Sequence, residues 1–339
     1  MTSRLGVNVG GPTHAERMDL EEMQFTRTLG PDFPLQPMLP FTAKMALDSG
    51  VTYRQLRELV HLGLIRRLIK GVYLATEAGD TLELRVAGLK LVVPKDAVVV
   101  DRHAGWLLGA DMMLAPGEHL DLQPLSIFLP AGRGRLRNDL AASGERTFRD
   151  DDIVEIDGLL VSSALRTAWD VGRVRWPERA IAGIDQMHRL GQYDPGEFLA
   201  GIDRFRGQRY VTTLRAVAPL ADGRAESPPE SVLRIWSTDV RGLDLVPQLE
   251  VSRGGRLFGR LDLGNEQLKI GVEYDGAEWH STPDQLVRDR IRRADMIEDG
   301  WLIEVFTKDD TFHRLADPGV RLRRLRDRAY QRLTGVTAA

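Results

Sequence analysis

The sequence of 339 residues contains no cysteine. This absence excludes disulfide bonds, zinc sites built on thiolates and cysteine nucleophiles together. It is consistent with a reducing compartment, and we expect a cytoplasmic protein. No run of about 18 apolar residues occurs, so we expect no membrane-spanning segment. Residues 1–16 also lack the apolar core of a signal peptide.

The chain has no strong excess of charge of either sign. Its 46 Lys and Arg residues face 49 Asp and Glu residues, which gives a net charge of −3. Any affinity for nucleic acid must therefore come from local basic patches and not from the overall charge. Because single cores rarely support a chain of this length, we expect two or three domains.

Composition and periodicity divide the chain into segments that together predict a mixed α/β fold. Residues 1–39 are rich in Gly and Pro and predict an extended arm or a disordered stretch. Residues 40–76 have the pattern of a winged helix-turn-helix, and residues 77–220 that of a mixed α/β region. Residues 221–229 are interpreted as a linker. Residues 226–335 alternate helix and strand and predict a small α/β domain.

The helix-turn-helix segment consists of two short helices followed by a hairpin. Thr42 and Thr52 are expected to cap the two helices. Two apolar strands around a turn at Lys70 and Gly71 predict the hairpin, which would be the wing.

The second helix and the hairpin are rich in cations. Arg54 and Arg57 share one face of the helix, opposite an apolar stripe. Such a face can enter a major groove, with cations of the hairpin on phosphates beside it. A solvated amphipathic helix is the alternative explanation. The candidate DNA-binding residues are Tyr53, Arg54, Arg57, Arg66, Arg67 and Lys70.

The same stretch resembles the N-terminal winged helix of AbiEi-type abortive-infection antitoxins. The resemblance rests on residues 42–43, 50–56, 63–67 and 70–73. Residues 162–170 are similar to a segment that follows this module in many actinobacterial proteins. The resemblance implies a winged helix that binds operator DNA, followed by an AbiEi-like middle domain.

Carboxylates near the C-terminal end form the clearest chemical pattern. A strand that contains Asp262 is followed by a turn and by a strand with Glu273 and Asp275 on one face. If these strands pair as a hairpin, Asp262 approaches Glu273. Carboxylates that converge in this way would bind Mg²⁺, which prefers oxygen ligands.

An acidic residue, a turn and a glutamate on a hairpin are the skeleton of the PD-(D/E)xK nuclease superfamily. Residues 272–276, 280, 288–290 and 300–306 resemble more closely the very-short-patch-repair-like endonuclease family, in which a glutamate opens the first helix. The resemblance implies a restriction-endonuclease-like domain with Mg²⁺ or Mn²⁺ as cofactor and DNA as partner. It places Glu230, Asp262, Glu273 and Asp275 around the metal, and His280 as a general base or phosphate contact.

One position departs from the superfamily pattern. The lysine that usually follows the glutamate by two residues is replaced by Asp275, as it often is in the repair-like subfamily. Lys269 and Lys308 are the candidates to replace it. Alternatively, Glu273 and Asp275 could pair with arginines of the helix expected at 283–299 and hold no metal.

That helix is expected to bury one apolar stripe and to turn its charges outward. The stripe consists of Val287, Ile291, Ala294 and Ile297, and the charges are Arg288, Arg292 and Asp295. We expect Asp289 to flank the carboxylate site. The arginine-rich tail at 321–332 would either bind phosphates or form an exposed terminal helix.

These patterns favour a metal-dependent DNA endonuclease that is targeted by its winged helix. A second hypothesis is a repressor or antitoxin-like regulator whose nuclease-like domain is inactive. A third is a protein-interaction scaffold in phage defence, in which DNA binding is incidental. The sequence predicts neither the oligomeric state nor the target sequence.

Overall fold

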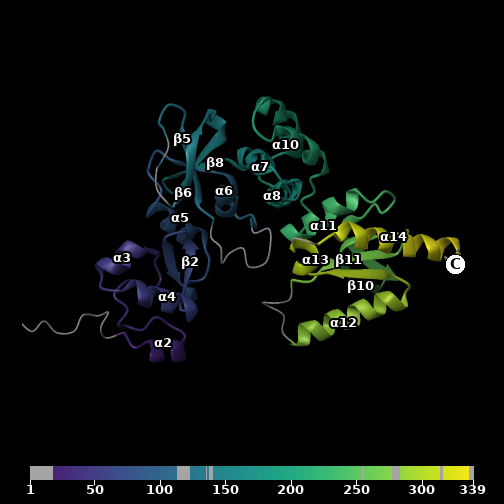
Figure 1. Cartoon of the computed structure of the whole chain (residues 1–339), viewed down its shortest axis with the longest axis horizontal. Helices are drawn as coiled ribbons and strands as arrows, with labels where there is room; N and C mark the ends of the chain where they lie inside the picture. The colour runs from purple at the N-terminus through teal and green to yellow at the C-terminus, as the bar shows by residue number, and fades with distance from the viewer. Residues whose placement is uncertain are drawn as a thin grey trace, which may run out of the picture. The chain divides into compact units, whose positions relative to one another are not determined.

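The computed structural model describes residues 18–112, 123–134, 136, 140–253, 256–276, 283–313 and 316–335 (Figure 1). The fold is mixed α/β, which confirms the fold class expected from the sequence. The chain forms two compact units: residues 1–99, 122–148 and 154–161 make the first, and residues 100–121, 149–153 and 162–339 make the second. Each helix in the described ranges is too short or too polar to cross a bilayer.

The first unit begins with the helices and the hairpin that the sequence predicts. The Thr42 hydroxyl accepts a hydrogen bond from the Met45 N–H at 3.1 Å, and Thr52 exchanges hydrogen bonds with Gln55 in a capping box. The hairpin strands are antiparallel, in the order β1-β3-β2. The elements are α2 (Leu20–Thr26), β1 (Phe41–Thr42), α3 (Ala43–Asp48), α4 (Tyr53–His61), β2 (Ile65–Ile69) and β3 (Val72–Ala75).

The described part of segment 1–39 is not an extended arm. Met23, Leu29 and Phe33 are buried in one cluster with Phe41 and Leu59. Apolar side chains spaced along a Gly- and Pro-rich stretch can pack without long regular structure, which is why periodicity did not reveal them. Residues 18–39 therefore belong to the core that supports α4.

A five-stranded sheet, preceded by the helices η1 and α5, follows the hairpin of the first unit. Its order is β6-β5-β4-β8-β7, with β4 parallel to β8 and antiparallel to β5. The strand candidates at 98–100 and 126–129 correspond to β4 and β5. The elements are η1 (Thr76–Ala78), α5 (Leu82–Lys90), β4 (Val98–Val99), β5 (Leu125–Pro130), β6 (Ala141–Arg146), β7 (Ile153–Ile156) and β8 (Leu159–Ser162).

Helices form the first half of the second unit. The long helices α7 and α8 pack around Trp169, Ile184 and Phe198. The elements are α6 (Asp101–Leu108), η3 (Asp150–Asp152), α7 (Ala164–Gly172), α8 (Pro177–Arg189), α9 (Pro195–Ala200), η4 (Gly201–Phe205), α10 (Val211–Val217) and η5 (Ala218–Leu220).

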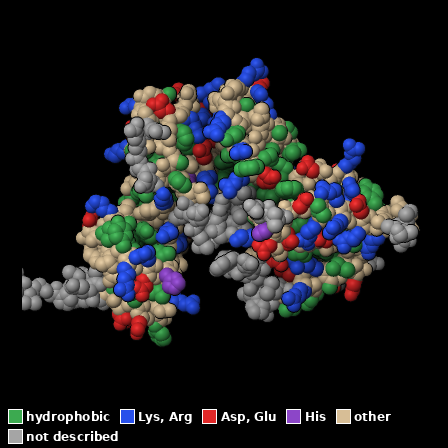
Figure 2. All heavy atoms as spheres, viewed as in Figure 1, with side chains coloured by type: hydrophobic (Ala, Val, Ile, Leu, Met, Phe, Trp, Pro, Cys, Tyr) green, Lys and Arg blue, Asp and Glu red, His purple; other side chains and the backbone are tan. Residues whose placement is uncertain are grey.

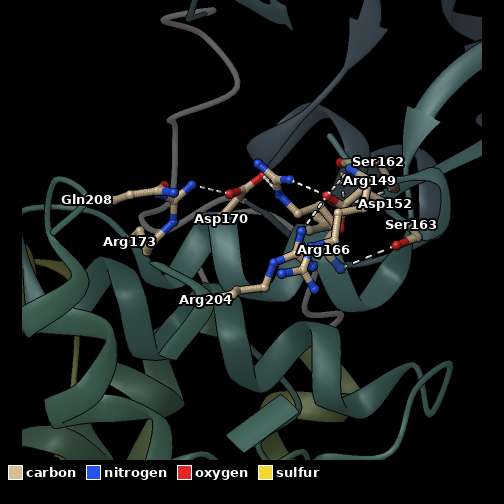
Figure 3. A network of polar contacts seen from close by, with 10 residues as sticks. Arg149, Asp152, Ser162, Ser163, Arg166, Asp170, Arg173, Arg204 and Gln208 are labelled. Atoms are coloured by element: carbon tan, nitrogen blue, oxygen red, sulfur yellow. Dashed lines mark hydrogen bonds and ion pairs between the residues drawn. The ribbon is translucent and has the colours of Figure 1, made fainter. Parts of the chain in front are cut away.

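A buried network of charges ties η3, α7 and η4 together (Figure 3). Asp152, which is 1% exposed, accepts hydrogen bonds from Arg166 at 2.6 Å and from Arg204 at 2.7 and 2.9 Å. Arg166 also donates to Asp170 at 2.8 Å. Each guanidinium group thus has a carboxylate partner, which offsets the cost of its burial.

Replacing Asp152 with alanine is expected to destabilise the protein by about 3 kcal/mol or more, because the buried Arg166 and the partly buried Arg204 lose their shared carboxylate. Chemical unfolding measures the effect. The matched control is Asp203→Ala, whose ion pair with Arg215 is exposed at 2.8 Å and should contribute less than about 1 kcal/mol. An equal loss of unfolding free energy in the two variants would contradict this account.

The second half of the second unit is a four-stranded sheet between helices. Its order is β12-β11-β10-β9, and only the β11–β12 pair is parallel. Helices α11 and α14 cover one face, and α12 lies on the other (Figure 1). The elements are α11 (Pro228–Thr238), β9 (Val246–Arg253), β10 (Arg256–Asn265), β11 (Ile270–Tyr274), α12 (Pro283–Glu298), β12 (Leu302–Phe306), α13 (Lys308–Phe312) and α14 (Pro318–Thr334).

Residues 221–229 are packed and do not form a free linker. Ala225 is fully buried, and Gln186 of α8 donates a hydrogen bond to its carbonyl at 3.3 Å. Nearly two turns into α11, Arg234 donates to Asp185 of α8 at 2.5 Å. Both side chains of this ion pair are buried, so α11 is held firmly against the helical half of the unit.

The orientation of α12 differs from the expectation. Val287, Ile291 and Ile297 are 53–56% exposed, whereas Met296 is fully buried against Leu261. The helix instead turns Met296, Arg292 and Arg293 towards the sheet, where Arg292 and Arg293 meet the carboxylate of Glu273. The apolar stripe predicted to be buried is therefore on the outside.

Candidate functional site

Glu273 occupies the middle of the candidate site. It lies near the end of β11, is 3% exposed, and faces two guanidinium groups of α12. Arg293 Nε donates a hydrogen bond to Oε2, and Arg292 Nη2 lies 2.9 Å from Oε1. The contact of Arg292 is an ion pair without hydrogen-bond geometry, so the buried Oε1 accepts no hydrogen bond. Glu273 is therefore charge-compensated at both oxygens, although only Oε2 accepts a hydrogen bond.

Asp262 lies beside Glu273, as the hairpin pattern predicts. Leu263 of β10 pairs with Val272 of β11 in antiparallel register. Asp262, one residue before Leu263, therefore lies opposite Glu273, one residue after Val272. The Tyr274 N–H donates to Asp262 Oδ2 at 2.8 Å. Burial, and then the charge of Glu230, raise the pKa of Asp262 to about 7, although the Tyr274 hydrogen bond acts in the opposite direction.

Glu230 is the third carboxylate and comes from the first turn of α11. Pro228 and Pro229 begin this helix, and Glu230 is 7% exposed. It accepts hydrogen bonds from the Ser227 hydroxyl at 2.7 Å, the Glu226 N–H at 2.8 Å and Gln248 Nε2 at 2.8 Å. Burial raises the pKa of Glu230 in spite of these hydrogen bonds. Its charge is close enough to oppose the ionisation of Asp262.

These carboxylates have the chemistry of a site for a divalent cation. Carboxylate oxygens are the ligands that Mg²⁺ and Mn²⁺ prefer, and Oε1 of Glu273, which accepts no hydrogen bond and is ion-paired with Arg292, is an atom that a cation could bind. As the side chains stand, no three His, Asp or Glu residues of the described ranges converge closely enough to hold an ion. Instead, Arg292 and Arg293 supply positive charge to Glu273.

The remaining sequence candidates have different outcomes. Asp275 follows β11, donates its N–H to the Phe306 carbonyl at 2.7 Å, and lies 3.9 Å from Arg293 Nη2. Asp289 pairs with Arg292 at 3.6 Å, and so borders the site as expected. His280 lies outside the described residues.

Neither lysine considered as a replacement contacts Glu273. Lys269 is at the opposite end of β11, where its ammonium group contacts Asp299 at 2.7 and 3.0 Å. Lys308 is exposed at the start of α13. The cations beside Glu273 are Arg292 and Arg293, a pairing that the sequence left open as one alternative. Met296 follows Arg293 by three residues and Arg292 by four, and this spacing is the pattern that would have indicated the inward face.

The side chains predicted to bind DNA are exposed on α4, whereas two of those on the hairpin are half-buried. Tyr53 is 64% exposed, and Arg54, Arg57 and Arg67 are exposed as well. Arg66 is half-buried: it donates to the Gly79 carbonyl, and burial lowers the pKa of its guanidinium group. Lys70 is also half-buried.

The arginine-rich tail forms α14, and some of its arginines make ion pairs with acidic residues of the same unit. Figure 2 shows Lys and Arg side chains over α14, interspersed with acidic ones. Arg321 contacts Glu304 at 2.6 Å and Asp310 at 2.6 Å, and Arg328 contacts Glu304 at 2.9 Å. Arg324 is exposed.

Comparison with known proteins finds two relatives and no matching family model. The relatives are the uncharacterized proteins MT2308 and Rv2248 of Mycobacterium tuberculosis strains CDC 1551 and H37Rv. Each is 30% identical to this chain over 282 residues, which cover 82% of this chain and 98% of the relative. The similarity thus extends over nearly the whole length of both relatives.

Proposed function

The chain belongs to the same family as these two mycobacterial proteins, and we propose that it is a DNA-binding protein with a metal-dependent phosphodiesterase domain. The single observation that carries the proposal is the group of three buried carboxylates on adjoining elements. Glu230, Asp262 and Glu273 come from a helix and two strands, and the charges of Glu230 and Glu273 oppose the ionisation of Asp262. Such clustering of like charges is costly for stability and is typical of functional sites.

In this proposal, Asp262 and Glu273 hold the cation and Glu230 completes the acidic lining. When bound, Mg²⁺ or Mn²⁺ would neutralise charge on a scissile phosphate and lower the pKa of water. Because their pKa values are raised, Asp262 and Glu230 hold protons more readily than exposed carboxyl groups do, and a bound cation would favour their ionised forms.

Arg292 and Arg293 take the role of the superfamily lysine. Both guanidinium groups already lie beside Glu273, and both side chains are 25% exposed, so solvent reaches them. A cation that binds Glu273 would replace them as its partner. The released guanidinium groups can then form bidentate hydrogen bonds to phosphate oxygens, which suits the charge that develops in phosphoryl transfer.

The exposed face of α4 would bring the phosphodiesterase domain to its target. Tyr53 and Arg54 begin this helix and Arg57 lies one turn later, and DNA-reading helices commonly contact base edges with their N-terminal residues. Arg67 of β2 would contact phosphate beside it. Arg66 is a weaker candidate, because its guanidinium group is engaged by the Gly79 carbonyl.

Incubating the purified chain with supercoiled plasmid tests the proposal. We expect nicked and linear products with Mg²⁺ or Mn²⁺, and none with EDTA. Mismatched duplex and single-stranded DNA extend the test to other substrates. DNA binding without cleavage of any of these substrates would contradict the phosphodiesterase proposal.

The second candidate function is a DNA-binding regulator with an inactive nuclease-like domain. The observation that favours it is the pairing of Glu273 with two arginines, together with Asp275 at the usual lysine position. In that case the arginines would fulfil a structural role in place of a cation. Sequence-specific binding that is unaffected by EDTA, without cleavage, is the result that this function predicts.

Both functions predict that Arg54→Ala combined with Arg57→Ala weakens DNA binding. Losing two phosphate or base contacts should lower the affinity at least about tenfold and reduce its dependence on salt. Fluorescence anisotropy with labelled duplex measures both effects. The matched control is Arg85→Ala: this arginine lies outside α4 and the hairpin, and it pairs with Asp80 at 2.6 Å. Unchanged binding in the double variant would exclude α4 as the contact.

A further inference from the structure

The outer face of α12 has the pattern of a buried helix face but is exposed. Val287, Ile291 and Ile297 are 53%, 56% and 54% exposed, and Ala294 between them is exposed as well. The spacing from Val287 through Ile291 to Ala294 (i, i+4 and i+7) is that of a continuous stripe along one side of a helix. Burying such a stripe removes apolar area from water, which favours a partner.

The opposite face of α12 is already engaged with its own sheet. Met296 is buried against Val251 and Leu261, and Arg292 and Arg293 contact Glu273. The helix therefore cannot rotate to bury its outer stripe without removing Met296 from the core and both arginines from the carboxylate. The stripe is therefore left open to a partner.

The charges that border the stripe indicate which partner it fits. Arg288 and Asp295 are seven residues apart, so they lie two turns apart along the same edge of the stripe. If two copies of the helix pack antiparallel about a two-fold axis near Ile291, Arg288 of each copy faces Asp295 of the other. The apolar stripe and both charges are then satisfied by the same surface of a second chain, as an isologous interface requires.

We propose that α12 is a homodimer interface, in which the Val287–Ile291–Ala294 stripes of two copies pack antiparallel between reciprocal Arg288–Asp295 ion pairs. Nucleic acid fits this face less well, because phosphates cannot cover an apolar centre and Asp295 would repel them. A single helix pair buries less area than a standard interface of roughly 1,200–2,000 Å², so the dimer should be weak. The proposal is independent of the carboxylate site.

Light scattering combined with size-exclusion chromatography tests the interface on the full chain. At roughly 100 µM, where a weak dimer is populated, we expect a mass between those of a monomer and a dimer that rises with concentration. Ile291→Glu should give the monomer mass at every concentration. The control Leu333→Glu places the same charge on an exposed leucine of α14 and should leave the dimer unchanged.

Charge exchange tests the antiparallel register. Arg288→Asp alone places two like charges together and should weaken the dimer, whereas Arg288→Asp with Asp295→Arg should restore it. A wild-type chain that stays monomeric over this range would overturn the proposal, and so would a dimer that tolerates Ile291→Glu. Loss of DNA binding in Ile291→Glu, from a chain that is always monomeric, would assign the stripe to nucleic acid instead.

Discussion

Replacing Glu273 with glutamine is expected to abolish metal-dependent cleavage of DNA. Glutamine keeps the size of the side chain but removes the negative charge that attracts a cation into this buried position. Loss of a group in the second shell of a metal typically lowers activity about 10–100-fold, so loss of a direct ligand should exceed a hundredfold. Initial rates of plasmid nicking in Mn²⁺ measure the effect.

Glu304→Gln is the matched control for this experiment. Glu304 lies on the neighbouring strand β12 and also faces two arginines, at 2.6 and 2.9 Å, but those arginines belong to α14. Its loss removes an ion-paired glutamate from the same sheet without touching Asp262 or Glu273. We expect the nicking rate of this variant to stay within a few-fold of the wild type. An equal loss of nicking rate in both variants would mean that Glu273 affects cleavage only by stabilising the fold.

Asp262→Asn is expected to stabilise the protein at pH 8 in the absence of divalent cations. The pKa of Asp262 is raised from 3.8 to about 7, mainly by burial. Between these values the folded protein holds a proton that the unfolded chain has released, so stability falls as the pH rises through this window. Asparagine removes the buried charge while still accepting the Tyr274 hydrogen bond. The gain above pH 7 should reach at most about 4 kcal/mol.

Unfolding by urea in EDTA at pH 4.5 and pH 8 measures this difference. The difference between the two proteins should be much smaller at the lower pH, about 1 kcal/mol, because Asp262 is then protonated in the folded wild type and pH 4.5 lies only slightly above the pKa of 3.8 in the unfolded chain. Asp327→Asn changes an exposed carboxyl group on α14 and serves as the control that should not alter the pH profile. A wild-type protein whose stability relative to Asp262→Asn is the same at both pH values would refute the assignment of a buried, protonated Asp262.

The local patterns of the sequence predicted most elements of the fold. Thr42 and Thr52 cap their helices as expected, because capping depends on residues only a few positions away. The pairing of β10 with β11 followed from the short turn between them, and it brought Asp262 to Glu273. By contrast, the burial of Met23 and Phe33 depends on contacts with the helix-turn-helix core, which no local pattern shows.

The side of α12 that faces the sheet could not be predicted from its periodicity. The apolar stripe through Val287 and Ile291 is the most regular feature of the helix, yet it is the outer face. The inner face carries Arg292 and Arg293, and their burial is favourable only because Glu273 lies opposite. Periodicity reports which residues prefer burial, but not whether the partner is the same chain, another chain or a charge.

The engagement of Arg66, which makes it a weaker candidate for the predicted DNA contact, has a similar cause. Its position in a basic hairpin suggested a phosphate contact, but the chain returns through Gly79 and offers a carbonyl to the guanidinium group. This contact depends on the path of the chain after β3, which the hairpin pattern does not specify. Arg54 and Arg57 remain on the outer face of α4, as helical periodicity predicted.

The central claim is that Asp262 and Glu273 together bind a divalent cation, and titration with Mn²⁺ tests it most directly. Isothermal titration calorimetry at pH 8 should detect one site per chain in the wild type. Asp262→Asn and Glu273→Gln should each weaken that binding at least tenfold, and Glu304→Gln should not. A wild-type protein that binds no Mn²⁺ at millimolar concentration, or binding that both site variants retain, would contradict the claim.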